Sequence, residues 1–316
     1  MTMNTFTNLS AESRIFYDRN LLLRAKDNLF IMTAARMANI PKNGGTSINY
    51  RRFDQLAVNT TPLSEGVTPV ASSNSITSVS ATVAQYGSFM YLTDQLDLMG
   101  IDPVIVESTS QIAQQAGESL ETVILNELVT GTNIRNVTGS ARNAQTTSSL
   151  LTSAIVQKAI RTLHATGKAK PFMGSNESRG LGGRWFGYIN PYVWYDYRQD
   201  TDVKNTFIYS KPGTNETLYF QDFDGVMWHA TNLAPVFAGA GASSNDVYAT
   251  FIMGKEYFGC VDVGGTGRFQ TYVQQLGSGG TADPLHQRAT VGYKFYQAPK
   301  ILNNGYGVRI ESGASA

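Results

Sequence analysis

The chain is poor in charge, and this shortage narrows the classes of protein it can belong to. Lysine, arginine, aspartate and glutamate make up 16% of the 316 residues, and the formal net charge is +1, whereas ordinary soluble proteins carry about 25% charged residues. No lysine or arginine run is longer than the pair Arg51 and Arg52, so the basic stripe of a sequence-specific nucleic-acid binder is missing. A polar but weakly charged surface suits contacts between identical copies, because like charges then repel little.

Cysteine and long apolar runs are also scarce. The single cysteine, Cys260, cannot form an internal disulfide, which is typical of a protein made in a reducing cytoplasm. It lies in the apolar segment YFGCVDV, which predicts a buried and unreactive thiol. The stretch MTMNTFTNLSAESR has no apolar core and no small-residue cleavage site, so it is not a secretory signal. The longest apolar runs are too short to span a bilayer, and we expect no membrane partner.

Residues that could carry catalysis or hold a metal are equally few. Three histidines lie far apart in the sequence: His164, His229 and His286. With one cysteine and no HExxH pattern, no zinc site can be written. No phosphate loop or GxSxG motif occurs, and Gly264 to Gly267 reads as a plain turn. We interpret two carboxylate pairs as solvated loop acids: Asp97 with Asp102, and Asp222 with Asp224. We therefore expect no enzyme, no metal and no cofactor.

Aromatic residues are concentrated in one segment. Its members are Trp185, Tyr188, Tyr192, Trp194, Tyr195 and Tyr197. Such a segment can form a platform on which sugars or bases stack. Large aromatic side chains also dominate protein cores and interfaces, and we favour that interpretation.

Apolar periodicity predicts two long helices. In residues 11–38 apolar pairs recur every seven residues, which indicates an amphipathic helix. This helix either packs on its own core or forms an arm that docks on a neighbouring subunit. Residues 102–131 give a second helix, with Asp102 at the N-cap, Pro103 in the first position and Gly131 as the stop. Its apolar line runs through Ile105, Ile112, Ala116, Leu120, Ile124 and Leu128. A helix of this size is about 42 Å long, which suits a spine.

The remaining chain reads as strands and shorter helices. Residues 46–53 and 77–93 predict two strands, the second with Val79, Ala81, Val83, Phe89 and Tyr91 on one side, joined by the turn-rich stretch 54–75. A two-stranded ribbon is only marginally stable alone, so it needs a surface to lie on. Further strands are expected at 185–189, 226–230, 247–253, 290–297 and 306–310, helices from 152 to 164 and from Pro191, and a mobile glycine-rich segment at 173–184. The class is α+β.

Several longer strings carry a family resemblance. They are SRIFYDRNLLLRAKDNLF (13–30), INYRRFDQL (48–56), TTPLSEGVTP (60–69) and ADPLHQRATVGYKFYQAPKILN (282–303). Together with the long helix between them, they resemble the N-4-type family of tailed-bacteriophage major capsid proteins over nearly the whole chain. Tyr293 stands where the family pattern has tryptophan.

The resemblance implies the HK-97-type capsid fold. In that fold residues 1–40 would be an N-terminal arm and residues 41–98 an extended ribbon, the E-loop. A peripheral domain would use 99–150, with the spine helix at 102–130, and the closing strands at 281–316. The axial domain would be 151–280. We expect no cleaved scaffolding segment fused in front of the arm.

The resemblance also implies a function in self-assembly. Pentamers and hexamers of the chain would form an icosahedral shell around double-stranded DNA, made in the bacterial cytoplasm and ending in the virion. Partners would be other copies, decoration, scaffolding and portal proteins, and DNA through non-specific contacts. Arg51, Arg52 and Glu65 are the candidates for charged contacts between subunits. The alternatives are an encapsulin-like nanocompartment shell and a β-rich adhesin or glycan-binding protein.

Overall fold

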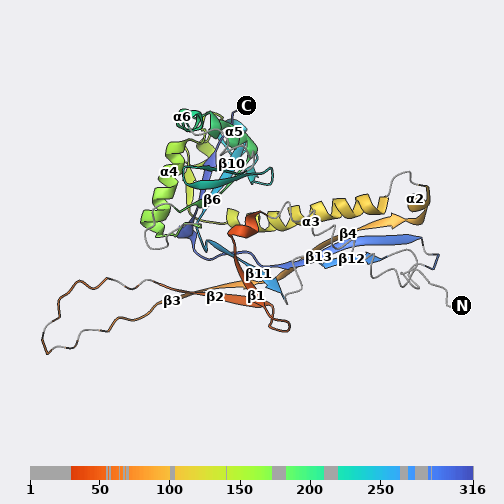
Figure 1. Ribbon diagram of the computed structural model, residues 1–316, viewed down its shortest axis with the longest axis horizontal. Helices are drawn as coiled ribbons and strands as arrows, with labels where there is room; N and C mark the ends of the chain where they lie inside the picture. The colour runs from red at the N-terminus through yellow and green to blue at the C-terminus, as the bar shows by residue number, and fades with distance from the viewer. Residues whose placement is uncertain are drawn as a thin grey trace.

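The computed structural model describes residues 30–54, 56, 58–63, 65–66, 68, 71–99, 104–139, 141–172, 183–209, 220–263, 270–274, 284–285 and 287–315. Figure 1 shows a long helix lying beside a narrow sheet, a body of sheet and helices at one end, and a ribbon that extends away from both. We call these the peripheral part, the axial body and the ribbon. None of the described helices is both long and apolar enough to cross a lipid bilayer.

The long helix α3 spans Val104–Val129 and confirms the predicted spine. Five members of its predicted apolar line are buried: Ile112, Ala116, Leu120, Ile124 and Leu128. The helix ends where the N–H groups of Thr130 and Gly131 donate to the carbonyls of Glu127 and Leu128. The predicted N-cap and first position, 102–103, lie outside the described residues.

The helix covers one face of a three-stranded antiparallel sheet, in the order β12-β13-β4. These strands are β4 (Ala84–Thr93), β12 (Gln270–Gln274) and β13 (Arg288–Gln297). β13 pairs with β4 along its full length, from Arg288 opposite Thr93 to Gln297 opposite Ala84. Tyr293 points from β13 to the helix, and its hydroxyl lies 3.1 Å from Ser119 Oγ. A phenol here therefore gains a hydrogen bond to the spine.

The single strand predicted for 77–93 is wrong, because the chain breaks at Val83 into β3 (Ile76–Thr82) and β4. The break shifts the alternation of side chains by one position. Ala81 and Leu92 are buried, whereas Phe89 and Tyr91 are 62% and 60% exposed. These two aromatics therefore lie on the face of the sheet opposite to α3, not on the side predicted for them.

The axial body is built on a seven-stranded sheet in the order β5-β15-β10-β6-β8-β7, with β9 paired to β10. The strands are β5 (Ile134–Asn136), β6 (Trp185–Ile189), β7 (Phe220–Phe223), β8 (Val226–Ala230), β9 (Val236–Phe237), β10 (Val247–Met253) and β15 (Gly307–Ser312). The strands predicted from 185, 226 and 247 are confirmed with their bounds. Trp185, Tyr197 and Trp228 fill the core on one face.

Short helices surround this sheet. They are α4 (Ser153–Thr162), α5 (Pro191–Gln199), α6 (Thr201–Tyr209), η3 (Arg142–Ala144), η4 (Leu163–Gly167), η5 (Ala242–Ser244) and η7 (Asn304–Tyr306), while α2 (Asp94–Met99) lies in the peripheral part. The predicted helix at Pro191 is confirmed, with Asn190 Oδ1 accepting from the N–H of Tyr192 at 3.0 Å. The helix predicted from 152 is confirmed as α4, continued by η4.

A small third sheet joins the parts, in the order β1-β11-β14. Its strands are β1 (Arg36–Ile40), β11 (Phe258–Val263) and β14 (Lys300–Ile301). The helix predicted for 11–38 is therefore wrong at its end, where a 3-10 turn, η2 (Ile31–Ala34), leads into β1. Parallel pairing with β11 overrides the helical pattern of the local sequence. Residues 11–29 lie outside the described part.

A buried ion cluster fixes the end of α3 to the axial sheet. Glu311, 1% exposed, lies 2.6 Å from Arg142 and 3.0 Å from Arg309. The Arg309 guanidinium also donates to the carbonyl of Val129, the last residue of α3. The Arg142 guanidinium stacks 3.6 Å from the centre of the Phe237 ring. One carboxylate therefore neutralises two arginines at the joint between spine and axial body.

We predict that Glu311→Ala lowers the free energy of unfolding by about 3–5 kcal/mol, because it leaves two largely buried cations without their counter-charge. Glu256→Ala is the matched control, because Glu256 pairs with Arg36 at 3.6 Å with both side chains about half exposed, and the loss should stay below about 1 kcal/mol. Urea unfolding measures both. Equal losses would show that the cluster does not stabilise the joint.

Candidate assembly interface

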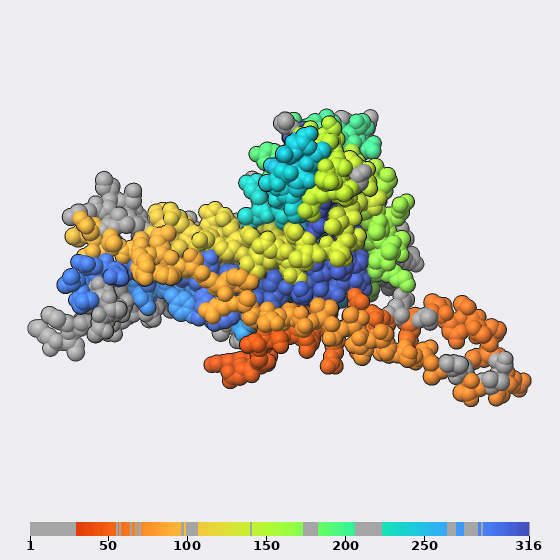
Figure 2. Space-filling view, turned by 180° about the vertical axis from the view of Figure 1, so that it is seen from behind, coloured from red at the N-terminus to blue at the C-terminus, as the bar shows by residue number. Residues whose placement is uncertain are grey.

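The ribbon is a two-stranded antiparallel sheet of β2 (Ser47–Phe53) and β3. Its register runs from Ser47 opposite Thr82 to Phe53 opposite Ile76. The predicted strand 46–53 is confirmed. Figure 1 shows the ribbon leaving the base of the molecule, and Figure 2 shows from behind that its outer end projects well beyond the body.

Tyr50 anchors the base of the ribbon. It is buried in a small apolar cluster with Ile40, Ala81, Val261 and Ala298. Its ring lies against Gly259, where a Cβ atom would stand 2.8 Å from the ring, and its hydroxyl donates to the carbonyl of Cys260 at 3.4 Å. Burial raises the pKa of Tyr50 to about 12. The inner half of the ribbon is thereby attached to its own chain.

Asp54 holds the two sides of the ribbon together where the strands end. Its carboxylate accepts hydrogen bonds from Thr77 Oγ1 at 3.1 Å, Ser75 Oγ at 3.2 Å and Arg52 Nε at 3.2 Å. The hydrogen bond from Thr77 is the main cause that lowers the pKa of Asp54. The N–H of Asp54 also donates to the carbonyl of Ser75. The outer half of the ribbon begins at this clamp, with the paired residues Phe53 and Ile76.

The outer half exposes apolar side chains to solvent. The exposed fractions are Phe53 64%, Leu56 53%, Val58 83%, Leu63 73% and Ile76 53%. Nothing in the described part of the chain covers them. Soluble monomers rarely expose apolar side chains in such a concentration, and surfaces of this kind mark sites of protein contact.

The three predicted contact residues all lie on the ribbon. Arg51 is exposed on β2, and Glu65 is exposed at a turn next to Gly66, whose φ of +78° requires glycine. Arg52 is half-buried and pairs with Asp54 of the same chain. Arg51 and Glu65 are therefore presented outward, whereas Arg52 is engaged in the clamp. Their contact with another subunit stays a prediction.

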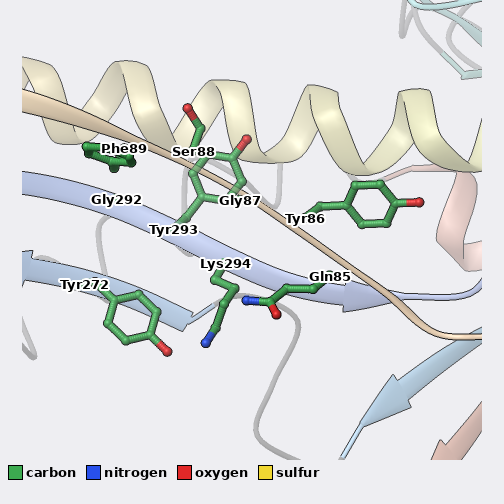
Figure 3. A pocket seen from close by; sticks show the side chains of 9 residues that line it. All are labelled: Gln85, Tyr86, Gly87, Ser88, Phe89, Tyr272, Gly292, Tyr293 and Lys294. Atoms are coloured by element: carbon green, nitrogen blue, oxygen red, sulfur yellow. The ribbon is translucent and has the colours of Figure 1, made fainter. Parts of the chain in front are cut away.

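A second uncovered surface is the face of the peripheral sheet opposite to α3. Phe89, Tyr91 and Tyr272 are exposed there, and Phe89 and Tyr272 border a shallow depression of about 440 Å³. Its floor is glycine at Gly87 and Gly292, the latter packed so closely that a Cβ would lie 2.7 Å from Phe89 Cβ. Figure 3 shows Tyr272 and Lys294 on the side away from the helix and Tyr293 directed towards it.

Lys294 places one positive charge on this aromatic surface. Its Nζ lies 5.1 Å from the Tyr272 ring centre and 5.6 Å from that of Tyr296. The hydrogen bond with Tyr272 is the main cause that raises the pKa of Lys294. The depression therefore combines an aromatic surface with the ammonium group of Lys294. Such a surface suits the binding of an apolar segment that carries a carboxylate. The local sequence pattern does not predict this surface, because it does not reveal that the alternation of side chains between the two faces shifts at Val83.

A buried carboxylate attaches the N-terminal segment. Glu121 Oε1 accepts from the N–H groups of Phe30 and Ile31 at 2.7 Å and 3.1 Å, and Oε2 accepts from the Tyr188 hydroxyl at 2.9 Å. Glu121 is 1% exposed, and burial raises its pKa. This one side chain of α3 thus joins the N-terminal segment to β6. This role of Glu121 depends on residues distant in sequence, so the local sequence pattern does not reveal it.

His229 lies beside the same attachment. Its ring stacks on that of Phe30, with centroids 3.8 Å apart, and lies 5.7 Å from that of Tyr188. Burial lowers the pKa of His229 to about 4. It therefore stays neutral near pH 7 and acts as a packing residue. His164 also contacts a ring, that of Trp185.

The other sequence-based candidates divide clearly. Trp185, Tyr188, Trp194 and Tyr197 are buried, which confirms the core interpretation for them, whereas Tyr192 and Tyr195 are exposed. Cys260 is buried, as predicted.

Asp224 is not a solvated loop acid, because it accepts hydrogen bonds from Ser153 Oγ at 2.6 Å and the Tyr197 hydroxyl at 2.8 Å. Outside the described residues or side chains lie Asp97, Asp102, Asp222, His286, 264–267 and nearly all of 173–184.

We predict that Tyr50→Ala detaches the ribbon base at a cost of about 3–5 kcal/mol, because it empties the apolar cluster. Limited proteolysis should then cut residues 47–82 much faster than in the wild type. Tyr50→Phe is the control, since it keeps the ring and removes only the long hydrogen bond. Unchanged cleavage of Tyr50→Ala would contradict the assigned anchor.

We predict that protonation of His229 lowers the free energy of unfolding as the pH falls. Its pKa is about 4 in the folded chain and 6.5 in the unfolded one, so the unfolded state binds more protons between these values. The contribution is complete above pH 6.5 and is lost as pH falls towards 4. From pH 7 to pH 5 the free energy of unfolding should drop by about 2 kcal/mol. His229→Gln should remove this drop, and an unchanged pH profile in that variant would count against it.

Comparison with known proteins gives matches in structure and none in sequence. No protein-family model matches the chain, and no curated protein matches it. Among solved structures, the capsid asymmetric unit of cyanophage Pam1 matches with a TM-score of 0.70 at 16% identity, covering 89% of both chains. The capsid of Ralstonia phage GP4 matches with a TM-score of 0.66 at 10% identity, covering 90% of this chain and 91% of that one.

A virus-like particle from Pyrococcus furiosus also matches, with a TM-score of 0.51 at 12% identity, covering 92% of this chain and 96% of that one. Each of these similarities covers at least 89% of both chains. The chain therefore has the fold of phage capsid proteins, the HK-97-type fold that the sequence predicts.

Proposed function

We propose that this chain is the major capsid protein of a tailed bacteriophage and builds an icosahedral shell of pentamers and hexamers around double-stranded DNA. The observation that carries the proposal is the uncovered apolar outer half of the ribbon on a chain with a capsid fold. A ribbon of this kind gains stability only when another molecule covers it. The most abundant molecule available during assembly is a second copy.

Head-to-tail contacts follow from this geometry. Each copy presents a projecting ribbon and, elsewhere, the uncovered aromatic face of its peripheral sheet. When one surface binds a different surface on the next copy, the contacts close into rings if the rotation permits. Burying the five exposed apolar side chains of the ribbon would contribute roughly 5–10 kcal/mol per copy, before the cost of ordering it. Closure of the shell multiplies such contacts.

The parts of the fold receive their roles in this proposal. Residues 1–40 form the N-terminal arm, 41–98 the E-loop, 99–150 and 281–316 the peripheral domain, and 151–280 the axial domain that surrounds the symmetry axes. The attachment of Phe30 and Ile31 to Glu121 supports an arm that begins at this point. The resemblance of the ribbon and C-terminal strings supports membership of the N-4-type family.

In this role the chain is a structural subunit without catalysis. It is made in the host cytoplasm and resides in the virion. Its further partners are scaffolding, portal and decoration proteins. The weakly charged surface, with charged residues at 16%, supports dense packing of identical copies.

An encapsulin-like nanocompartment shell is the second candidate. The similarity to the virus-like particle from Pyrococcus furiosus favours it, because that particle has a related fold. The two candidates differ in what the assembled particle encloses. Nuclease-protected double-stranded DNA inside purified particles supports the capsid, whereas a packaged cargo enzyme without DNA supports the nanocompartment.

We predict that the double charge reversal R51E/R52E reduces the yield of shells at least severalfold without unfolding the subunit, because Arg51 then repels its acidic partner on the next copy and the clamp at Asp54 is weakened. Negative-stain microscopy counts the shells, and circular dichroism reports folding. K42E/K204E carries the same change of charge at exposed sites outside the paired strands β2 and β3 and should assemble normally. Normal shells from R51E/R52E would refute the contact.

A further inference from the structure

The positive charge of this nearly neutral chain is distributed unevenly. Residues 128–176 contain no aspartate or glutamate, yet they contain six lysines and arginines. These are Arg135, Arg142, Lys158, Arg161, Lys168 and Lys170. Arg142 is neutralised by Glu311. The remaining five lie on or beside α4 and η4, so the question is where their side chains point.

The fold gathers these residues on one side of the axial body. In α4 the residues Ser153, Val156 and Ala159 are buried, so at 100° per residue Lys158 and Arg161 lie at the centre of the opposite, exposed side. Arg135 joins them from β5, because its Nη1 donates to Thr162 Oγ1 at 3.3 Å.

The helix continues this surface towards its C-terminal end. Lys168 follows η4 in a left-handed conformation, with φ of 52°. Lys170 is exposed, and its carbonyl accepts from the N–H of Lys255. We call Arg135, Lys158, Arg161, Lys168, Lys170 and Lys255 the basic face. No run of the sequence reveals it, because helical spacing and a loop contact assemble it.

Within the described part of the chain, three residues of the basic face make no ion pair. Across the described residues, no carboxylate lies within ion-pair distance of Lys158, Arg161 or Lys170. Asp224 accepts from Gln157 and Ser153 at the start of α4, and Glu256 pairs with Arg36. Lys158, Arg161 and Lys170 are thus left for an external anion.

We propose that the basic face binds the backbone phosphates of double-stranded DNA, without reading its sequence. The inference rests on the proposed function and names the surface through which the shell touches its content. Lys158 and Arg161 are separated by about 4.5 Å along the helix axis, which is close to the roughly 3.4 Å of axis per phosphate on one DNA strand. A row of separate cations matches a row of separate phosphates without needing any base contact.

A second copy of the chain fits this surface less well. A homotypic partner would need an equally concentrated acidic surface. Four of the described acids are already engaged within the chain. They are Asp54 by Arg52, Glu121 by backbone N–H groups, Glu127 by Lys300 and Glu311 by two arginines. A polyanion supplied from outside the chain is the complementary partner.

The test measures the binding of a fluorescent 20-base-pair duplex to the full-length protein by anisotropy, at salt concentrations from 50 to 200 mM. K158Q/R161Q should bind at least about tenfold more weakly at 100 mM salt, and the slope of log K against log salt should decrease in magnitude by roughly 2. The matched control is K42Q/K204Q, which removes the same charge from exposed sites elsewhere and should change the affinity less than twofold.

Two outcomes would overturn the proposal. Equal weakening in both double variants would show that only net charge matters, and unchanged binding in K158Q/R161Q would show that DNA does not use this face. If K158Q/R161Q stops forming shells while its DNA affinity is unchanged, the face is an interface between copies instead. Failure of the wild type to form shells would contradict the proposed function, whereas normal shells with unchanged DNA binding in K158Q/R161Q would contradict this inference alone.

Discussion

The structure depends on one constraint: the ribbon carries more apolar surface than the described part of its own chain covers. At its base, Tyr50 is packed among Ile40, Ala81 and Val261, and the carboxylate of Asp54 closes the two strands. Beyond this clamp, side chains such as Val58 and Leu63 are largely exposed. The hydrophobic effect therefore favours association over the monomer, and the ribbon is held by its base in a position to be covered.

The rest of the molecule holds that ribbon in place, because its parts are joined by buried polar contacts. The spine α3 is fixed to the axial sheet by the cluster of Arg142, Arg309 and Glu311, and to the N-terminal segment and β6 by Glu121. Both fixtures use a buried carboxylate whose partners are fully engaged, so a change of angle between the parts would leave charges unpaired. This arrangement gives each copy a defined shape, while the uncovered surfaces provide the contacts.

Much of the fold could be predicted from the sequence, because its long elements carry strong local signals. The apolar line of α3, the helix start at Pro191 and the strands from 185, 226 and 247 depend on local spacing. What failed depends on distant contacts. The end of the predicted N-terminal helix pairs instead with β11, and the alternation shifts at Val83 because β3 and β4 join different sheets. The basic face and the aromatic face of the peripheral sheet were missed for the same reason. Arg51 and Glu65 are exposed and Arg52 is engaged with Asp54, and their contact with another subunit stays a prediction.

Amide hydrogen exchange tests the central claim most directly, when it is compared between the unassembled subunit and the assembled particle. The account predicts that peptides covering residues 53–76 exchange rapidly in the subunit and become strongly protected in the particle, while the axial core around Trp185 is protected in both. Rapid exchange of this segment in the particle, or equal protection in the lone subunit, would contradict the claim that another copy covers the ribbon.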